Sequence, residues 1–363
     1  MSKNSPLTSK ISFFQTSIFS TINQSSKGKN VILSPFSIYK ILSLTTNGAR
    51  GAPQTQMLSI LNSDLLSNLN SLNSKINDIL KASESIQVAN AIMTKIIPSK
   101  EFSSKADEYD TIIDKLESVE QVNNWVKKKT NEKIDSIIHK LESSTKILIL
   151  NAVYFKGEWQ QPFDPDATSK SDFYNFNNEN NPKKVETMRQ SWKYFYYENN
   201  DIQTVQLPYK KDGVSAIIIL PKKNVDINSI NINDNLLTQI NINSNKIGLH
   251  LELPKFEIKF ESSLVQTLKN MGMIYAFNNA DFTGITDKNY LDIYINDIIH
   301  KAYLKVDEYG TEAAAITAEF IEDRCGPLEE ETMIVNRPFY MAIINNLLPQ
   351  HNQVLFIAKI EEI

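Results

Sequence analysis

The stretch that decides the fold reads Gly310-Thr-Glu-Ala-Ala-Ala-Ile-Thr-Ala-Glu-Phe320 and continues as Ile321-Glu-Asp-Arg-Cys-Gly-Pro327. Its first part consists of small, β-tolerant side chains, and strand alternation would put Thr311, Ala313, Ala315 and Thr317 on one face. Its second part is polar and turn-like, as expected of an exposed loop. A strand-like start followed by an exposed arginine predicts a loop with two locations: solvent, or the space between neighbouring strands.

Length, charge and cysteine content narrow the class of protein. The chain has 363 residues and a net charge of −4, which disfavours a general nucleic-acid binder. Cys325 is its one cysteine, so no internal disulfide and no cysteine-based metal cluster can form. No apolar run of signal-peptide or membrane-spanning length follows the first ten residues. We therefore expect a cytoplasmic protein without a signal peptide, with leaderless secretion as the alternative.

Apolar spacing predicts helices first and strands later, which indicates one α+β domain. The expected helices are Ile11–Ile22, Pro35–Leu44, Leu58–Leu80, Val122–Leu141 and Ser263–Met271, while the Asn-rich stretch from Asn224 to Asn245 suggests polar loops. The expected strands are Ile147–Phe155, Tyr194–Tyr197, Gln203–Leu207, Val214–Leu220, Gly248–Leu253, Lys255–Phe260, Tyr294–Val306, Phe339–Asn345 and Gln353–Ile360.

The sequence lacks the motifs of common catalytic and metal sites. The four histidines are scattered, and the chain has no HExxH, Walker or GxGxxG motif. Cys325, beside Arg, Gly and Pro, lacks the rigid base and oxyanion donors that a cysteine nucleophile needs. The sequence therefore predicts no enzyme, no cofactor and no metal site.

Ordered motifs along the chain carry a resemblance to a known family. They include Asn30-Val-Ile-Leu-Ser-Pro-Phe-Ser-Ile38, Leu150-Asn-Ala-Val-Tyr-Phe-Lys-Gly-Glu-Trp159, Leu207-Pro-Tyr209, Leu253-Pro-Lys-Phe256, His300-Lys-Ala302, Asp307-Glu-Tyr-Gly-Thr-Glu-Ala-Ala-Ala315 and Asn336-Arg-Pro-Phe339. With these motifs the chain resembles a serpin from about residue 10 to residue 360. The resemblance implies a single domain over residues 1–363, with three β-sheets, eight to nine helices and an exposed reactive-centre loop at about 308–335.

The resemblance also implies a suicide-substrate inhibitor. A protease would cleave the loop and be held as an acyl-enzyme while the cleaved loop inserts into the central sheet. In the family the cleaved bond follows the residue fourteen positions after the hinge glycine, which here gives Arg324–Cys325. An arginine at that position suits trypsin-like serine proteases. The hinge would comprise Gly310, Thr311, Glu312, Ala313, Ala314 and Ala315.

Acidic residues beside the expected bond leave alternatives open. Cleavage after Asp323 would suit an Asp-directed protease, and a papain-like protease that accepts arginine is a further alternative. Glu319 and Asp323 share the strand parity of Thr311, so full insertion would turn both carboxylates inward, at a cost unless they find partners. A non-inhibitory serpin, acting as a chaperone or carrier, is therefore the second hypothesis. Oxidation of Cys325 beside the bond would be a way to tune activity.

Two further groups of residues match family positions that govern opening of the sheet. The sheet-opening (shutter) positions are Ser34, Ser37, Asn151 and His300, and the breach positions are Trp159, Lys255 and Glu308. The alternative role of His300, compatible with the first, is that of a hydrogen-bonded core histidine. The region of the family's heparin-binding helix, at about Asn62 to Lys81, contains only two lysines, so no polyanion cofactor is expected. We expect a monomer whose partner is a protease, and neither a nucleic acid nor a membrane.

Overall fold

The computed structural model describes residues 8–82, 86–178, 180–210, 213–278, 280–288, 290, 293–311, 331–345 and 353–363. The chain forms two compact units. The first contains Met1–Ile22, Leu33–Tyr154 and Lys259–Tyr303, and the second contains Asn23–Ile32, Phe155–Ile258 and Leu304–Ile363.

The first unit holds most of the helices. They are α1 (Thr8–Ser25, which ends in the second unit), α2 (Pro35–Gly48), α3 (Gly51–Ile60), α4 (Leu66–Ala82), α5 (Lys100–Glu108), α6 (Val119–Lys129) and α8 (Val265–Asn270). Ser34 caps α2, because its side chain accepts a hydrogen bond from the Ser37 amide and proline occupies the first turn.

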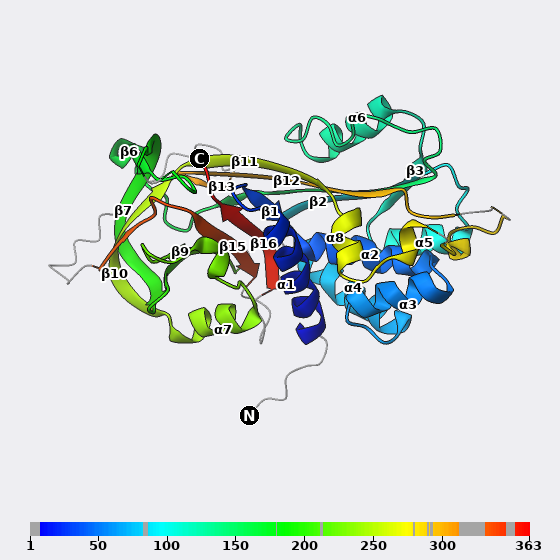
Figure 1. Ribbon diagram of the computed structural model, residues 1–363, viewed down its shortest axis with the longest axis horizontal. Helices are drawn as coiled ribbons and strands as arrows, with labels where there is room; N and C mark the ends of the chain where they lie inside the picture. Colours follow the sequence, from blue (N-terminus) through cyan, green and yellow to red (C-terminus); the bar gives the residue numbers. More distant parts are fainter. Residues whose placement is uncertain are drawn as a thin grey trace. The chain divides into compact units, whose positions relative to one another are not determined.

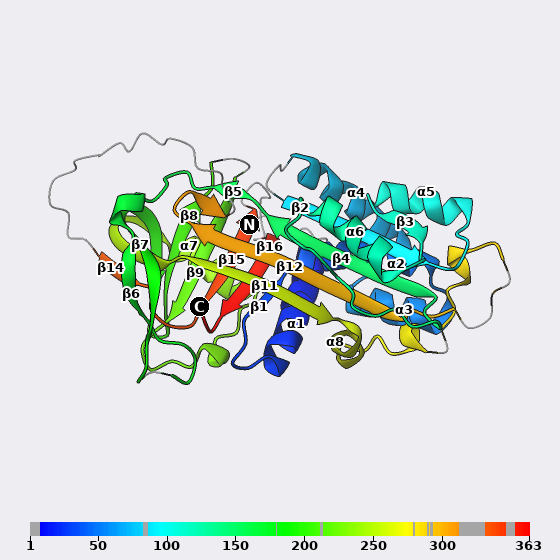
Figure 2. The same ribbon diagram turned by 90° about the horizontal axis from the view of Figure 1, so that it is seen from above.

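The strands of the first unit run in the order β3 (Ile112–Lys115), β2 (Ile86–Thr94), β4 (Ile147–Phe155) and β12 (Asp297–Asp307), and β11 (Phe256–Ser263) also pairs with β12. β4 and β12 are parallel neighbours, paired directly from Leu148↔Asp297 to Tyr154↔Tyr303 (Figure 2). All nine residues of β4 are buried. Its nearly continuous apolar sequence therefore reflects a strand covered on both faces.

Strand alternation divides the residues of these strands between the two faces. Ala91 of β2 and Leu150 of β4 pack in one core cluster with Val122 and Val126 of α6. Figure 1 shows α6 on the opposite side of these strands from α2. The odd-numbered Asn151 points to the α2 side, where it contacts Ser37.

The second unit is built mainly of strands. They are β1 (Val31–Leu33), β5 (Gly157–Glu158), β6 (Ser169–Phe173), β7 (Lys183–Glu198), β8 (Ile202–Pro208), β9 (Val214–Pro221), β10 (Asn245–Pro254), β13 (Gly310–Thr311), β14 (Glu331–Ile334), β15 (Phe339–Asn345) and β16 (Gln353–Ile360), with the helix α7 (Asp234–Asn243). Nine of these strands form a sheet in the order β1-β16-β15-β9-β8-β7-β10-β14, with β6 also on β7.

One long strand explains why the nine strands form a continuous sheet. β7 pairs with β10 from Thr187 to Tyr196, and its last residues, Phe195–Glu198, pair with β8. It thereby joins a group of β6, β10 and β14 to a group of β8, β9, β15, β16 and β1. The described strands therefore form two continuous sheets, this one of nine strands and one of seven around β4 and β12, where three sheets were expected.

The α+β class is confirmed, with eight α-helices in the described part of the chain. Strands at Ile147–Phe155 and Phe339–Asn345 have the expected bounds. The single helix predicted for Leu58–Leu80 is wrong, because α3 ends at Ile60 and Asn62 adopts a left-handed φ of 50° before α4 begins. The polar stretch from Asn224 contains α7, and the strand β2 was not predicted.

The predicted helix Val122–Leu141 also ends early, at Lys129. Asn131 and Glu132 turn the chain with φ of 48° and 64°. Beyond the turn, the backbone amides of Ile137 and Ile138 donate to the Asn123 side chain at 2.8 and 3.1 Å. The apolar spacing after Lys129 therefore reflects side chains that pack in the core, although the backbone there is not helical.

Candidate functional site

The described chain reaches the predicted loop at β13, a strand of two residues. Thr311 and Gly310 pair with Val306 and Asp307 of β12 on one side. On the other side they pair with Gly157 and Glu158 of β5. The loop therefore starts as a strand that is hydrogen-bonded on both edges, and Thr311 is fully buried there.

Gly310 is the residue that lets β13 fit. Its φ is +152°, which L side chains rarely adopt, and an added Cβ would lie 2.0 Å from the Gly157 carbonyl oxygen and 2.8 Å from Glu158 Cα. Both obstacles are backbone atoms, so neither can move aside as a flexible side chain would. The close approach of two backbones requires glycine at this position.

Two aromatic rings support the same strand. Trp159 is 1% exposed and stacks on Tyr209 with ring centroids 4.5 Å apart. The indole Nε1 donates to the Asp307 carbonyl at 3.0 Å, and the Tyr209 hydroxyl shares a 2.7 Å hydrogen bond with Thr311 Oγ1. The two rings thus hold both the turn that precedes β13 and the Thr311 side chain of β13.

A carboxylate of the same turn is held by an ion pair. Glu308 Oε1 lies 3.0 Å from Lys255 Nζ and accepts a hydrogen bond from Thr168 Oγ1 at 2.9 Å. Burial alone would raise the pKa of Glu308. Hydrogen bonds from its own backbone amide, Lys255 and Thr168, with the charge of Lys255, outweigh burial and lower that pKa. We refer to Trp159, Tyr209, Lys255, Glu308, Gly310 and Thr311 as the loop-start cluster.

The four predicted sheet-opening residues lie together in the first unit, all 0–1% exposed. Asn151 Oδ1 accepts from Ser37 Oγ at 3.0 Å and contacts His300 Nδ1 at 2.6 Å, and Ser37 Oγ also lies 3.0 Å from the Ser34 carbonyl. With Oδ1 as the acceptor, the network assigns the proton to Nδ1 of the imidazole. Asn151 and His300 are register partners on β4 and β12, so these bonds join the two strands.

Asn90 completes this group. Its Oδ1 accepts from Asn151 Nδ2 at 2.5 Å, and its side chain is 3% exposed. We refer to Ser34, Ser37, Asn90, Asn151 and His300 as the amide cluster. Its members are buried polar side chains that hydrogen-bond one another, although Asn90 Nδ2 has no partner in the described part of the chain.

Sequence reasoning missed several of these residues as site members. Tyr209 appeared only within the Leu-Pro-Tyr motif, and Asn90 lies in Val88-Ala-Asn-Ala91, where a lone amide in an apolar strand was the available signal. Gly157 carried none, because its role depends on the approach of a segment about 150 positions later in the chain.

The remaining predicted residues lie outside the described part of the chain. They are the hinge residues Glu312, Ala313, Ala314 and Ala315 and the reactive-bond residues Arg324 and Cys325. Within the described ranges, no group of three or more His, Cys, Asp or Glu side chains is arranged to hold a metal ion. No described helix combines the length and apolar character needed to cross a membrane.

Comparison with known proteins gives a consistent result. The family model of serpins, described as serine protease inhibitors, matches residues 9–363. Intracellular coagulation inhibitor 2 of Tachypleus tridentatus is 31% identical over 93% of this chain and 86% of its own length. Leukocyte elastase inhibitor of Xenopus tropicalis is 30% identical over 94% of this chain and 96% of its own.

Solved structures agree with the sequence comparison. The thermophilic serpin tengpin in its native state aligns with a TM-score of 0.89 at 28% identity, covering 100% of this chain and 96% of its own. The family model and both curated relatives span nearly the whole chain, as does this structural match. The chain belongs to the serpin family.

Proposed function

We propose that the protein inhibits a trypsin-like serine protease as a suicide substrate cleaved at Arg324–Cys325. The protease serine oxygen attacks the Arg324 carbonyl carbon and forms an ester, and Cys325 leaves with a new amino terminus. The cleaved loop then extends β13 along β12 and inserts before the ester is hydrolysed. The names of two relatives, an intracellular coagulation inhibitor and a leukocyte elastase inhibitor, support an inhibitory role.

The observation that carries the proposal is the double pairing of β13. A buried Thr311 with hydrogen-bonded neighbours on both edges is the first rung of a longer strand. Because these backbone pairings already exist in the uncleaved protein, the inserted strand does not have to be nucleated. Further residues need only add hydrogen bonds to the two neighbouring strands. After cleavage, the small side chains of Ala313, Ala314 and Ala315 would make little steric demand on a longer strand.

The energy of insertion is large enough to act on a protease. An added strand of about fourteen residues gains hydrogen bonds worth roughly 0.5–1.5 kcal/mol net each, on the order of 10 kcal/mol in all. Against this stands the direct pairing of β4 with β12, which includes the bond between Asn151 and His300. We therefore propose that the amide cluster determines how strongly the sheet resists insertion of the loop. The loop-start cluster would determine where insertion begins.

Further parts of the proposal rest on the sequence. We treat residues 1–363 as one functional serpin domain, because the family model runs from 9 to 363 without interruption. We place the inhibitor in the cytoplasm as a monomer, with a protease as its partner and without a heparin-like cofactor.

The test is incubation with trypsin, followed by denaturing electrophoresis and mass spectrometry. We expect a complex that survives denaturation and a new terminus at Cys325, with both lost in Arg324→Ala. Cleavage after Arg324 without a complex would contradict inhibition and favour a non-inhibitory serpin. An uncut loop would contradict the trypsin-like target and direct the assay to Asp-directed and papain-like proteases.

A further inference from the structure

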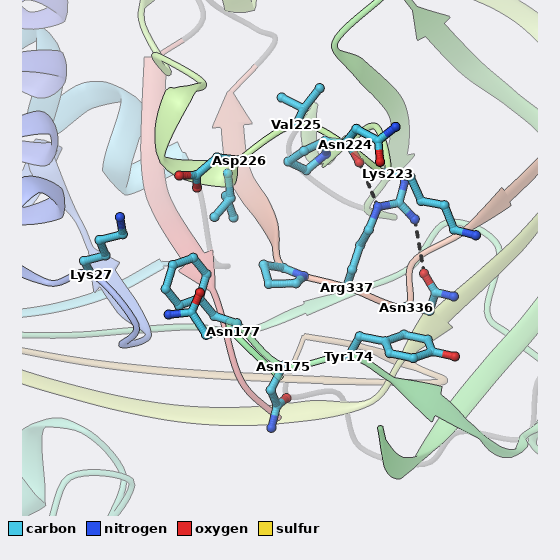
Figure 3. Close-up of a pocket in the computed structure, with 14 residues that line it drawn as sticks. Lys27, Tyr174, Asn175, Asn177, Lys223, Asn224, Val225, Asp226, Asn336 and Arg337 are labelled. Atoms are coloured by element: carbon cyan, nitrogen blue, oxygen red, sulfur yellow. Dashed lines mark hydrogen bonds between the residues drawn. The ribbon is translucent and has the colours of Figure 1, made fainter. Parts of the chain in front are cut away.

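The second unit contains a cavity that shares no residue with the loop-start cluster. Its volume is about 760 Å³, within the range of roughly 300–1,000 Å³ that small-molecule sites occupy. Residues of three chain segments line it, 174–177, 221 with 223–227, and 336–338, together with Lys27 (Figure 3). None of these residues belongs to the loop-start cluster, the amide cluster or the proposed reactive bond.

The walls of the cavity are bonded to one another. The Tyr174 amide donates to the Asn336 carbonyl at 2.8 Å, and the Phe176 amide donates to the Glu361 carbonyl at 2.8 Å. Arg337 Nε donates to the Pro221 carbonyl at 2.9 Å, which ties the third segment to the second. A ligand would therefore meet a preformed site and would not have to order the chain around it.

The charged residues of the lining favour an anion. Three are cations, Lys27, Lys223 and Arg337, and one is an acid, Asp226, in a chain of net charge −4. The acid already has a structural task, because Asp226 Oδ1 accepts from the Asn228 amide at 2.9 Å and from Asn228 Nδ2 at 3.1 Å. The lining is thus locally positive in an acidic protein.

Arg337 is the central cation of this lining. Figure 3 shows its guanidinium bonded on one side to the 221–225 segment and on the other to Asn336, whose Oδ1 accepts at 3.1 Å. Both acceptors are neutral, and among the described residues Arg337 forms no ion pair. Partial burial also lowers its pKa, so an anion in the cavity would relieve a desolvated charge.

The uncharged part of the lining is aromatic and apolar. It consists of the half-buried side chains of Tyr174, Phe176, Val225 and Pro338 and the buried Pro221. A lining that combines aromatic rings with a guanidinium suits a ligand that is flat and negatively charged. We propose that this cavity binds a small aromatic organic anion, its ring against Phe176 and its acidic group toward Arg337 and Lys223.

Calorimetric titration with 2-naphthoate tests the proposal, and its neutral isostere 2-naphthamide serves as the matched ligand. We expect saturable binding of one 2-naphthoate, and an affinity for the amide that is weaker by about tenfold. Arg337→Gln should weaken 2-naphthoate binding by about tenfold and Lys223→Gln by about threefold. Lys246→Gln, which removes an exposed lysine of β10 outside the lining, should leave the affinity unchanged.

The location is tested separately by acetylation of lysines, read by mass spectrometry. Bound 2-naphthoate should slow labelling of Lys27 and Lys223 and leave Lys246 unaffected. The Lys223 measurements hold even if Arg337→Gln loosens the turn, because the Lys223 side chain is exposed. Equal binding of acid and amide, equal affinity in Lys223→Gln and Lys246→Gln, or no protection of Lys27 and Lys223 would each overturn the proposal.

Discussion

The loop-start cluster and the amide cluster hold strands in place by different physical means. In the loop-start cluster, shape dominates: two backbones meet at Gly310, two rings stack, and a partly exposed ion pair fixes the turn. In the amide cluster, polar side chains hydrogen-bond one another, and no member is more than 3% exposed. The first should respond to steric change and pH, and the second to the loss of single hydrogen-bonding atoms.

The difference suggests a division of tasks. Steric fit fixes where a strand begins, because only one residue type is accepted at the close approach of Gly310. A hydrogen-bond network fixes how readily β4 and β12 separate, because breaking it leaves buried polar groups without partners. Four changes to the two clusters test this division, in decreasing order of expected effect.

Gly310→Ala should have the largest effect. The new Cβ would lie 2.0 Å from the Gly157 carbonyl oxygen, so β13 must leave its place between β5 and β12. With overpacking and backbone strain of roughly 1–3 kcal/mol each, we expect about 4 kcal/mol lower unfolding free energy in urea titrations. Trapping of trypsin should fall with it.

The control is Gly51→Ala, at a glycine with φ of +59° and no atom within 4 Å of an added Cβ. It carries the strain of a left-handed residue without the clash, and should cost about 1 kcal/mol. If the two variants were equally stable, the close contact at Gly310 would not support β13 as described.

Asn151→Ala should be next in size. It removes the acceptor of Ser37 Oγ and His300 Nδ1 and the donor to Asn90 Oδ1, and of these three groups Ser37 Oγ keeps the Ser34 carbonyl as a partner. We expect a loss of about 3 kcal/mol in unfolding free energy, and faster exchange of β4 and β12 amides with solvent. The exposed Asn178→Ala should change stability by less than about 0.5 kcal/mol. A similar small value for Asn151→Ala would show that the network contributes little.

The two clusters also differ in how far the sequence could predict them. Polar side chains inside apolar runs, such as Asn151 in Ile147–Phe155, stand out because burial demands a partner. It was the resemblance that identified Ser34, Ser37, Asn151 and His300 as one group, and the structure places all four together. At the fold level, apolar runs located β4, β9 and β15 well, because burial on both faces leaves a nearly continuous signal.

Steric requirements were much harder to read. Nothing in the sequence around Gly157 or Tyr209 indicates which distant segment approaches them. Gly157 leaves no room for a side chain at position 310, and Tyr209 hydrogen-bonds Thr311. Helix ends failed for a related reason. The periodic isoleucines after Lys129 pack in the core, while the left-handed Asn131 and Glu132 had already ended the helix.

A double-mutant cycle on Tyr209 and Thr311 gives a smaller and more selective test. Tyr209→Phe removes the hydroxyl that bonds Thr311 Oγ1 at 2.7 Å and keeps the stacked ring on Trp159. Thr311→Val keeps the shape at 311 and leaves the buried hydroxyl of Tyr209 without this partner. We expect a coupling of about 1 kcal/mol in unfolding free energy. A coupling near zero would mean that shape alone holds β13.

The smallest effect should be the pH dependence of the ion pair, which the amide cluster lacks. Because the folded pKa of Glu308 is lowered from the ordinary value of 4.5, ionised Glu308 stabilises the fold above pH 4.5. That contribution is lost as pH falls through the folded pKa. Wild type should therefore exceed Glu308→Gln by about 0.5–1 kcal/mol at pH 6, a difference that vanishes under more acidic conditions.

Salt and a second variant separate this pair from general acid effects. Lys255 is 29% exposed, so about 0.5 M sodium chloride should reduce the advantage of wild type over Glu308→Gln at pH 6. The stability lost in Asn151→Ala should not change with salt, since no charge takes part. A stability gap at Glu308 that stayed constant from pH 3 to pH 6 would contradict the lowered pKa. In that case the turn would be held by the hydrogen bonds from Thr168 and from the backbone, which a glutamine can also accept.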